Sequence, residues 1–504
     1  MKKNWLFRKN FNLPFLLTAL LFLTLVVVAC GGTPETIVQE VEVTRVVTET
    51  VVETVVETVI EEVEGEMVEV EVTRVVEVEA AMEEELPYGL LPGKPYDGTE
   101  LTFLICCPAA AQFAAWADST AEFKELTGID VTFTNDPLGG LREKIVTESV
   151  GNPGSWDTTI YFGTWGPSLA QFLEPIETYS DQIDTNLLDY PNSSRQIATI
   201  DGVTYGIPVR SHVMMMYYRE DIFEELGLDV PTTWAELEDA ARIINEADNS
   251  TNGITMNWAN QGGGINLMVW TNFLRTNGTD LFDDNWRPIF NNAAGIEATE
   301  FYQGLLEYAP AGAPTYNEAD MRNSFASGEA AMAIGWSWSY NIFTREDTSE
   351  AIVRENVGFT SAIPGPSKGG SPISMAWPMG ISASSNNKEA SLEWIKWMTN
   401  PDLDLQVITA KDDPTRNTVV ANRLSSLFSA EANGPDANNG FSQAMGDAYS
   451  SATPELVYIE FPEVSVVLEA AMTEIATGGD VTAILNKAAA DVEAIMERSG
   501  RYDN

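Results

Sequence analysis

Histidine, cysteine and basic residues are scarce in this chain of 504 residues. It has one histidine, His212, and three cysteines, while Lys and Arg together number 28 against 75 Asp and Glu. A single histidine nearly excludes His-based metal sites and Ser-His-Asp catalysis of the usual kind. The sequence also lacks a Gly-rich phosphate loop, an H-E-x-x-H motif and a G-x-S-x-G motif. We therefore expect neither a metal ion nor another cofactor.

The charge of the chain excludes further partners. The formal net charge is −47 at pH 7, and the stretch from Pro87 to Asn504 carries −36. So negative a surface repels the phosphates of nucleic acids and the headgroups of anionic lipids. Nucleic acid is therefore not expected as a partner, and contact with a membrane would have to come from an anchor.

The first thirty residues have the pattern of a secretory signal. Four Lys and Arg residues precede the apolar run Phe15–Ala29, which is too short and wrongly flanked for an ordinary spanning helix. Val27-Val28-Ala29-Cys30 resembles the bacterial lipobox, in which the cysteine is lipidated and becomes the first residue of the mature protein. We predict a signal peptide over residues 1–29 and a lipid anchor on Cys30, with an uncleaved N-terminal anchor as the alternative. In both cases the rest of the chain is extracytoplasmic.

Residues 30–86 are predicted to form a stalk. From Pro34 onward they are almost entirely Val, Glu and Thr, with EVEVTRVV at Glu40–Val47 and again at Glu69–Val76. The segment carries a charge of −15 and has no aromatic ring, so it cannot fold as a globule. Alternation of Val and Glu suits a strand, whereas doubled Val every four residues suits the seam of a coiled coil. The pattern is compatible with both.

Residues 87–504 are too many for one hydrophobic core and suggest two lobes. Buried strands alternate with helical patterns at the start of this part. The predicted strands are 101–105, 129–133 and 156–162, and the predicted helices are 112–127 and 138–150. This alternation indicates an α/β fold with parallel sheets, whose ligands bind at the carboxyl ends of the strands. The loops after Ile105, Phe162 and Pro208 are therefore the places to expect a site.

Local signals in the second half predict two more helices. Thr233 and Glu236 have the spacing of a capping box at a helix start. Residues 391–398 are amphipathic, with Trp394 and Trp397 on the apolar face, where both are predicted to pack in the core.

Cys106 and Cys107 are adjacent in the sequence. Neighbouring cysteines rarely bridge each other, because the eight-membered ring strains the peptide between them. We expect two buried thiols after a strand.

Six segments in order resemble the extracellular solute-binding proteins that feed ABC importers, in particular the carbohydrate-type group with the maltose- and maltodextrin-binding proteins. The segments are Phe123–Phe133, Ser155–Ala170, Asp201–Leu237, Phe325–Trp338, Asn356–Ser382 and Asp412–Val420. The resemblance spans 100–497. The stalk and the acidic excess are not part of the family's pattern.

The resemblance implies a two-lobed periplasmic-binding-protein fold with three crossings, near Pro208, Pro364 and Pro414. Lobe 1 is then about 97–208 and 365–410, and lobe 2 about 209–364 and 411–500. The implied function is to capture a carbohydrate between the lobes, which close by hinge bending, and to deliver it to the permease of an ABC transporter. A monomer without catalytic activity is expected.

Sugars have apolar C–H faces and a rim of hydroxyls, so proteins bind them with flat aromatic rings and hydrogen-bonding groups. The chain has 12 Trp besides Trp5. The resemblance aligns Trp338 with a stacking Trp and Tyr340 with a second ring. Trp165 follows the third strand and is expected to be exposed without ligand. The predicted ligand-binding residues are Trp338, Trp165, Trp377, Trp336, Arg210, His212, Trp258, Tyr340, Arg416 and Tyr458.

Each of these predictions has an alternative. The Trp residues could be core, Arg210 could form a structural ion pair, and Arg416 could support a hinge. The same fold could instead bind a polyamine, a peptide or a polyol phosphate. A secreted glycosidase would need two carboxylates about 5–10 Å apart across a cleft, and no segment clearly supplies them. An adhesive or structural surface protein on a stalk is a further alternative.

Overall fold

The computed structural model describes residues 50–63, 66–79, 86–107, 111–247, 250–260, 263–367, 370–409, 420–434 and 439–503. The chain divides into two compact units, Met1–Met82 and Glu83–Asn504. The predicted signal peptide, Cys30, the crossing at Pro414 and Arg416 lie outside the described residues. Among the residues that are described, no helix combines the length and the apolar character needed to cross a membrane.

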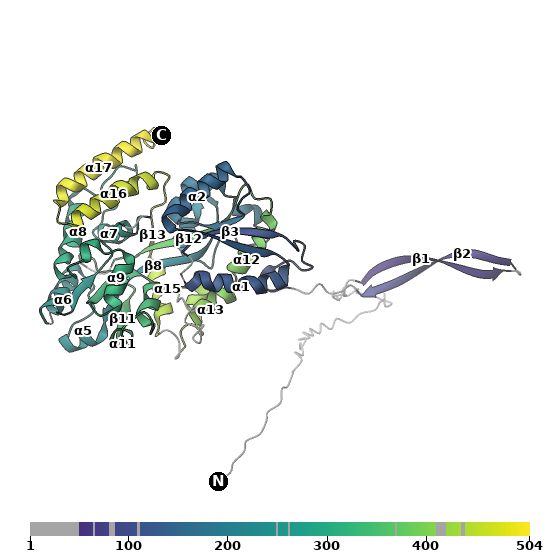
Figure 1. The fold of residues 1–504 in the computed structure, drawn as a ribbon, viewed down its shortest axis with the longest axis horizontal. Helices are drawn as coiled ribbons and strands as arrows, with labels where there is room; N and C mark the ends of the chain where they lie inside the picture. Colours follow the sequence, from purple (N-terminus) through teal and green to yellow (C-terminus); the bar gives the residue numbers. More distant parts are fainter. Residues whose placement is uncertain are drawn as a thin grey trace, which may run out of the picture. The chain divides into compact units, whose positions relative to one another are not determined.

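The described part of the first unit is an antiparallel pair of long strands, β1 (Thr50–Val63) and β2 (Glu66–Glu79) (Figure 1). The sequence pattern was compatible with a strand and with a coiled coil, and the structure has strands here. Val and Thr are stiff at χ1 and favour extended backbone. The register pairs Thr50 with Glu79 and Val63 with Glu66, and nowhere along it does a Glu stand opposite another Glu. Direct like-charge pairs, which destabilise a ladder, are thus avoided.

The second unit is built on a mixed sheet of nine strands. Its order is β4-β3-β5-β12-β8-β10-β9, with β11 also paired to β8 and β13 to β12. The strands are β3 (Glu100–Cys106), β4 (Asp130–Asp136), β5 (Thr158–Ile160), β8 (Ile207–Arg219), β9 (Asn252–Thr255), β10 (Ala330–Trp336), β11 (Val357–Thr360), β12 (Ile373–Ile381) and β13 (Thr453–Pro454), and a separate two-stranded sheet joins β6 (Thr199–Ile200) to β7 (Val203–Thr204).

Helices pack around this sheet (Figure 1). They are α1 (Ala111–Thr127), α2 (Leu138–Gly151), α3 (Gly166–Leu169), α4 (Asn192–Ala198), α5 (Glu220–Leu226), α6 (Trp234–Ala247), α7 (Ile265–Thr276), α8 (Ala293–Gly304), α9 (Glu318–Ala326), α10 (Ser339–Thr344), α11 (Ala351–Arg354), α12 (Lys388–Met398), α13 (Pro401–Thr409), α14 (Leu424–Leu427), α15 (Phe441–Ser451), α16 (Phe461–Ala476) and α17 (Val481–Arg498). Short 3₁₀ turns connect them: η1 (Pro87–Gly89), η2 (Gly163–Trp165), η3 (Ala170–Phe172), η4 (Ile176–Tyr179), η5 (Leu305–Tyr308) and η6 (Ala313–Thr315).

Strand β8 joins the two halves of the sheet. Its first half, Ile207–Val213, pairs antiparallel with β12, and its second half, Met214–Tyr218, pairs antiparallel with β10. Alternate side chains of the second half enter different cores, since Met214 and Met216 belong to one hydrophobic cluster and Met215 and Tyr217 to another. The second half of the strand is buried on both faces, which explains the apolar run Val213–Tyr218.

Most of the elements predicted from the sequence are confirmed. Helices α1 and α2 and strand β3 lie within one residue of their predicted positions, and β4 begins one residue and ends three residues later than predicted. The third strand is shorter than predicted. The capping box is present, because the Glu236 backbone N–H donates to Thr233 Oγ1 at 3.2 Å and the Thr233 N–H donates to the Glu236 carboxylate at 3.0 Å. Trp394 and Trp397 are buried.

Two expectations were wrong. Cys106 and Cys107 are not free thiols but form a disulfide. Cys107 leaves the strand with a positive φ of 58°, so its side chain does not alternate away from that of Cys106. The stretch after Pro208 is not a loop, because residues 207–219 form one continuous strand.

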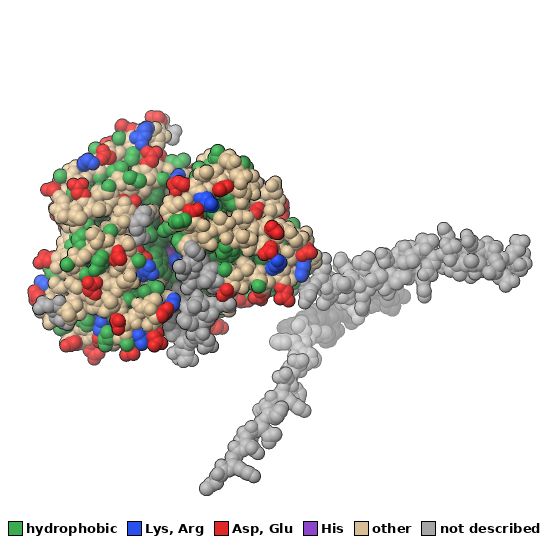
Figure 2. Space-filling view, viewed as in Figure 1, with side chains coloured by type: hydrophobic (Ala, Val, Ile, Leu, Met, Phe, Trp, Pro, Cys, Tyr) green, Lys and Arg blue, Asp and Glu red, His purple; other side chains and the backbone are tan. Residues whose placement is uncertain are grey.

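Acidic side chains are spread over the face of the second unit seen in Figure 2, with few Lys and Arg between them. The predicted acidic surface is therefore dispersed on this face and not gathered into one patch.

A buried ion pair holds the start of the second unit against α12. Lys396 Nζ donates to Glu393 Oε1 at 2.7 Å and to the Gly89 carbonyl at 3.0 Å, while the Leu91 N–H donates to Glu393 Oε2 at 2.8 Å. Only 4% and 2% of the two side chains are exposed. The pair thereby fixes residues 89–91, where the chain enters this unit.

Replacing Glu393 by Ala should lower the free energy of unfolding by about 3–5 kcal/mol, because it leaves a buried ammonium group without its counter-charge. Asp491→Ala is the matched control. It breaks the exposed pair of Asp491 with Lys487 on α17 and should cost no more than about 1 kcal/mol. Urea unfolding followed by circular dichroism measures both. Equal effects of the two substitutions would contradict the stabilising role of the buried Glu393–Lys396 pair.

Candidate functional site

The predicted residues Arg210 and His212 lie side by side on one face of β8. Arg210 Nε donates to His212 Nε2 at 2.9 Å. The imidazole is fully buried. Burial, and then the charge of Arg210, keep the pKa of His212 well below its usual range. Since the Nε2 atom accepts a hydrogen bond, the ring is neutral and carries its proton on Nδ1.

Trp338 and Trp336 cover this pair from the end of β10. The Trp338 ring lies 4.3 Å from the His212 ring, edge to face, and Trp336 lies nearly parallel to Trp338 at 5.7 Å. Trp338 Nε1 donates to Glu318 Oε1 at 2.7 Å, and Arg322 pairs with the same carboxylate at 2.8 Å. Glu318 and Arg322 both lie on α9. The orientation of the Trp338 ring is thus fixed by its hydrogen bond to Glu318 and by its contacts with the rings of His212 and Trp336.

The carboxyl of Glu318 is itself buried. Burial raises the pKa of Glu318, against the lowering effect first of Arg322 and then of the Trp338 hydrogen bond and Arg210. Burial also lowers the pKa of Arg210 to about 10, with Glu318 acting in the opposite direction. Opposite charges in this group therefore stabilise one another.

Trp377 approaches Arg210 from β12. The two residues are register partners on the neighbouring strands β12 and β8. The guanidinium carbon of Arg210 is 5.3 Å from the centre of the Trp377 ring and 5.7 Å from that of Trp338, which are cation–π distances. Arg210 therefore lies within reach of two aromatic rings that come from different strands.

The line of rings continues into the loop after β5. Phe162 lies 4.0 Å from Trp377, and Trp165 lies 4.9 Å from Phe162. We call the resulting set of seven side chains the aromatic cluster. Its members are Phe162, Trp165, Arg210, His212, Trp336, Trp338 and Trp377.

Three N–H donors in the aromatic cluster lack an acceptor. Among the described residues, no group accepts a hydrogen bond from His212 Nδ1, Trp336 Nε1 or Trp377 Nε1, and all three side chains are buried. Buried donors are nearly always paired in folded proteins. The cluster thus combines flat rings with donors that oxygen atoms of a ligand could accept from.

The structure brings together six of the predicted residues: Trp165, Arg210, His212, Trp336, Trp338 and Trp377. The expectation that Trp165 would be exposed was wrong. Its ring packs against Phe162, and only 6% of the residue is exposed. Phe162 and Glu318 were missed. Phe162 reads as an ordinary strand residue, and nothing in the sequence links Glu318 to Trp338, 20 positions later.

The structure places three predicted residues elsewhere. Strand β10 ends at Trp336 and α10 begins at Ser339, so Tyr340 turns away and stacks on Phe441 at 4.1 Å. Trp258 is fully buried, 6.1 Å from Tyr302.

Tyr458 lies in a different group of side chains. Its ring is 5.4 Å from Trp286 and lines a cavity of about 520 Å³ with Tyr205 and Arg501. No member of the aromatic cluster lines this cavity.

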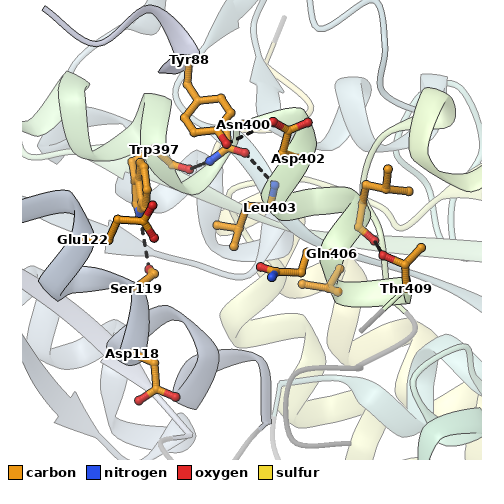
Figure 3. Close-up of a pocket in the computed structure, with 12 residues that line it drawn as sticks. Tyr88, Asp118, Ser119, Glu122, Trp397, Asn400, Asp402, Leu403, Gln406 and Thr409 are labelled. Atoms are coloured by element: carbon orange, nitrogen blue, oxygen red, sulfur yellow. Dashed lines mark hydrogen bonds between the residues drawn. The ribbon is translucent and has the colours of Figure 1, made fainter. Parts of the chain in front are cut away.

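Another cavity, of about 380 Å³, lies between α1 and the α12–α13 region (Figure 3). Tyr88 and Trp397 line it together with the carboxylates of Asp118, Glu122 and Asp402. Tyr88 donates its hydroxyl to Asp402 at 3.1 Å. None of the predicted ligand-binding residues that the structure describes lines this cavity.

Residues 109–403 match the family model of the bacterial extracellular solute-binding proteins.

Among curated relatives, a probable amino-acid ABC transporter periplasmic-binding protein of Sinorhizobium fredii is 24% identical over 321 residues, covering 62% of this chain and 71% of that protein. The mannitol-binding protein of Pseudomonas aeruginosa is 28% identical over 267 residues, covering 52% of this chain and 60% of that protein.

Among solved structures, maltose-bound MalE3 of T. maritima superposes with a TM-score of 0.70. It is 21% identical, and the match covers 79% of this chain and all of that one. At 21% identity, this similarity shows that the two proteins share a fold. That fold is the two-lobed architecture expected from the sequence.

His212 predicts a pH dependence of stability. Its pKa is lowered in the folded protein, so as the pH falls below about 6.5 the unfolded chain takes up the proton first and the free energy of unfolding decreases. The loss should approach about 1.4 kcal/mol per pH unit. Above about pH 7.5 this group has little effect on stability, since histidine is then mostly neutral in both states.

His212→Gln keeps a hydrogen-bond acceptor for Arg210 but cannot titrate. Because the chain has one histidine, the difference in pH dependence between wild type and variant isolates this residue from all carboxylates. Urea unfolding between about pH 5 and 7 measures it. Parallel pH profiles would show that His212 accepts a proton inside the fold.

Proposed function

The chain belongs to the bacterial extracellular solute-binding proteins, and from that premise we propose that it captures a carbohydrate or polyol at the aromatic cluster and delivers it to the permease of an ABC transporter. The proposed solute class is based on one observation: flat aromatic rings lie together with N–H donors that have no acceptor among the described residues. The buried N–H groups of His212, Trp336 and Trp377 have no acceptor among the described residues. Sugar and polyol oxygens are acceptors, and their C–H faces pack on aromatic rings.

The position of the cluster supports the same proposal. Its members come from β8, β10 and β12 and from the loop after β5, so they belong to both halves of the sheet. A solute that contacts both halves stabilises the closed form of a two-lobed protein over the open form. One relative of this chain is named a mannitol-binding protein. One protein of the same fold has been solved with maltose bound.

The N-terminal segment supports attachment to a membrane. The sequence before Cys30 has the pattern of a lipoprotein signal, and the segment after it contains the β1–β2 hairpin. A 14-residue strand at about 3.3 Å per residue is roughly 46 Å long. Lipidated Cys30 would hold the protein at the outer face of the cytoplasmic membrane, and the hairpin would act as a spacer.

Mannitol or maltose should raise the melting temperature of the full chain, because a solute bound only by the folded protein adds about 2.7 kcal/mol at a hundredfold excess over Kd. Trp338→Ala should raise the dissociation constant at least tenfold, since the substitution removes a ring from the site. Trp286→Ala is the control, because Trp286 is partly exposed and lies outside the cluster.

Differential scanning fluorimetry against mono- and oligosaccharides, polyols, polyamines and amino acids identifies the class. A shift with polyamines or amino acids alone would overturn the carbohydrate proposal. Release of reducing ends during incubation would overturn the proposal that the protein only binds.

Cys30→Ser should abolish the attachment to the membrane, because serine lacks the thiol that carries the lipid. In bacterial cells that express the full chain, the wild type should sediment with membranes and take up labelled palmitate. The variant should do neither. A variant that still sediments with membranes would point to the uncleaved N-terminal anchor instead.

A further inference from the structure

A disulfide joins the neighbouring residues Cys106 and Cys107 at the point where β3 ends. A disulfide usually stabilises a protein because it closes a loop of the unfolded chain, and the gain grows with the length of that loop. This bridge spans a single peptide bond and closes almost no loop. Its contribution to the stability of the whole fold should therefore be small, and a local role has to explain it.

Strand register places the bridge beside the aromatic cluster. Strands β3 and β5 are parallel, with Leu104 opposite Thr159. Continued to the ends of the two strands, this register brings Cys107 level with Phe162, which belongs to the cluster. Both residues thus lie at the carboxyl ends of neighbouring parallel strands, where sheets of this kind bind their ligands.

The same row of positions continues across the sheet. The strands β3, β5, β12 and β8 are neighbours in that order. Phe162 lies 4.0 Å from Trp377 of β12, and Trp377 is the register partner of Arg210 on β8. Cys107 is partly buried and packs against the hydrophobic core that contains both rings. It therefore stands at one end of a row whose other three positions belong to the aromatic cluster.

The backbone of Cys107 has a conformation that needs support. Its φ of 58° lies in the left-handed region, which costs free energy for any residue with a side chain unless the surroundings hold it there. The bridge supplies such a restraint, because it ties the Cys107 sulfur to Cys106, which is fully buried. Breaking the bridge removes the restraint, and Cys107 is then free to adopt the extended backbone that a strand favours.

We propose that the Cys106–Cys107 bridge is a redox-sensitive positioning element of the solute site, which holds the end of β3 in place beside Phe162 only while it is oxidised. The inference rests on the proposed function and goes further, because it makes the affinity for the solute depend on a reductant. Proteins of this family are extracellular. Disulfides form and persist in that environment, so the oxidised state is the binding state.

The switch is a thiol–disulfide exchange with a dithiol. A thiolate of the dithiol attacks one sulfur of the bridge, which breaks the S–S bond and forms a mixed disulfide, and the second thiol of the reductant then displaces the protein's sulfur. The bridge gains two electrons and two protons and becomes two thiols. The dithiol loses them and becomes a cyclic disulfide. Cys107 is the accessible target, because Cys106 is fully buried.

The test uses the full chain with Cys30→Ser, in which the bridge contains the only other cysteines. The protein is oxidised with copper–phenanthroline or reduced with dithiothreitol, and each state is titrated calorimetrically with mannitol and with maltose. The reduced state should have a dissociation constant at least about fivefold higher, the size expected from releasing a strained backbone. Ellman's reagent on the unfolded protein should count no thiols in the oxidised state and two in the reduced state. Two thiols after oxidation would overturn the inference.

Two double variants test the positioning role. Cys106→Ala with Cys107→Ala imitates the reduced state, so it should bind as weakly as the reduced protein and should not respond to dithiothreitol. Cys106→Ala with Cys107→Gly should recover most of the affinity of the oxidised protein, because glycine adopts a positive φ without a restraint. A glycine variant as weak as the alanine variant would show that the backbone at this position is not what the bridge controls.

Melting temperatures without solute separate positioning from folding. Reduction should change them little, because the bridge closes almost no loop. A large fall on reduction would assign the bridge to the stability of the fold and overturn the inference. Equal affinity of the oxidised and reduced states would also overturn it, and would leave the proposed function standing. Protein that binds neither mannitol nor maltose in either state would overturn the proposed function and this inference together.

Discussion

The architecture depends on one strand that is buried on both faces and yet carries a guanidinium group. Strand β8 pairs with β12 over its first half and with β10 over its second, so it connects the two halves of the sheet. Arg210 is only partly exposed on this strand, so it takes much of its interaction from the protein. It does so through the His212 imidazole and the faces of Trp338 and Trp377. The aromatic cluster is in part the solution to this requirement.

The same region keeps polar groups in an unfavourable state. A buried donor or acceptor without a partner costs about 1–3 kcal/mol. The donors of His212, Trp336 and Trp377 are in this state among the described residues, as are the indole N–H groups of Trp156 and Trp394 elsewhere in the second unit. Departures from the usual rules of packing are expected where a protein must bind something. A solute that supplies the missing partners would recover this free energy only when both halves contact it.

The hairpin obeys a different constraint. An isolated two-stranded hairpin is at best marginally stable. Its Val-rich strands gain from β-branched side chains, and its register keeps each Glu opposite Val, Thr, Ile or Met. Repulsion among the many Glu residues favours an extended shape. Length and charge rather than a core therefore define this segment.

Local patterns in the sequence determined the class of fold, most element positions, the capping box at Thr233 and the buried faces of the helices, because these depend on neighbours a few residues away. They could not choose between strand and coiled coil for the hairpin, since Val and Glu recur at both periods. The resemblance to the solute-binding family, and not a local pattern, marked Trp338, Arg210 and His212. Only the tertiary structure decided that Trp377 meets Arg210 and that Tyr340 turns away to stack on Phe441. These contacts join residues far apart in the chain, and strand register, which no local pattern encodes, sets the first of them.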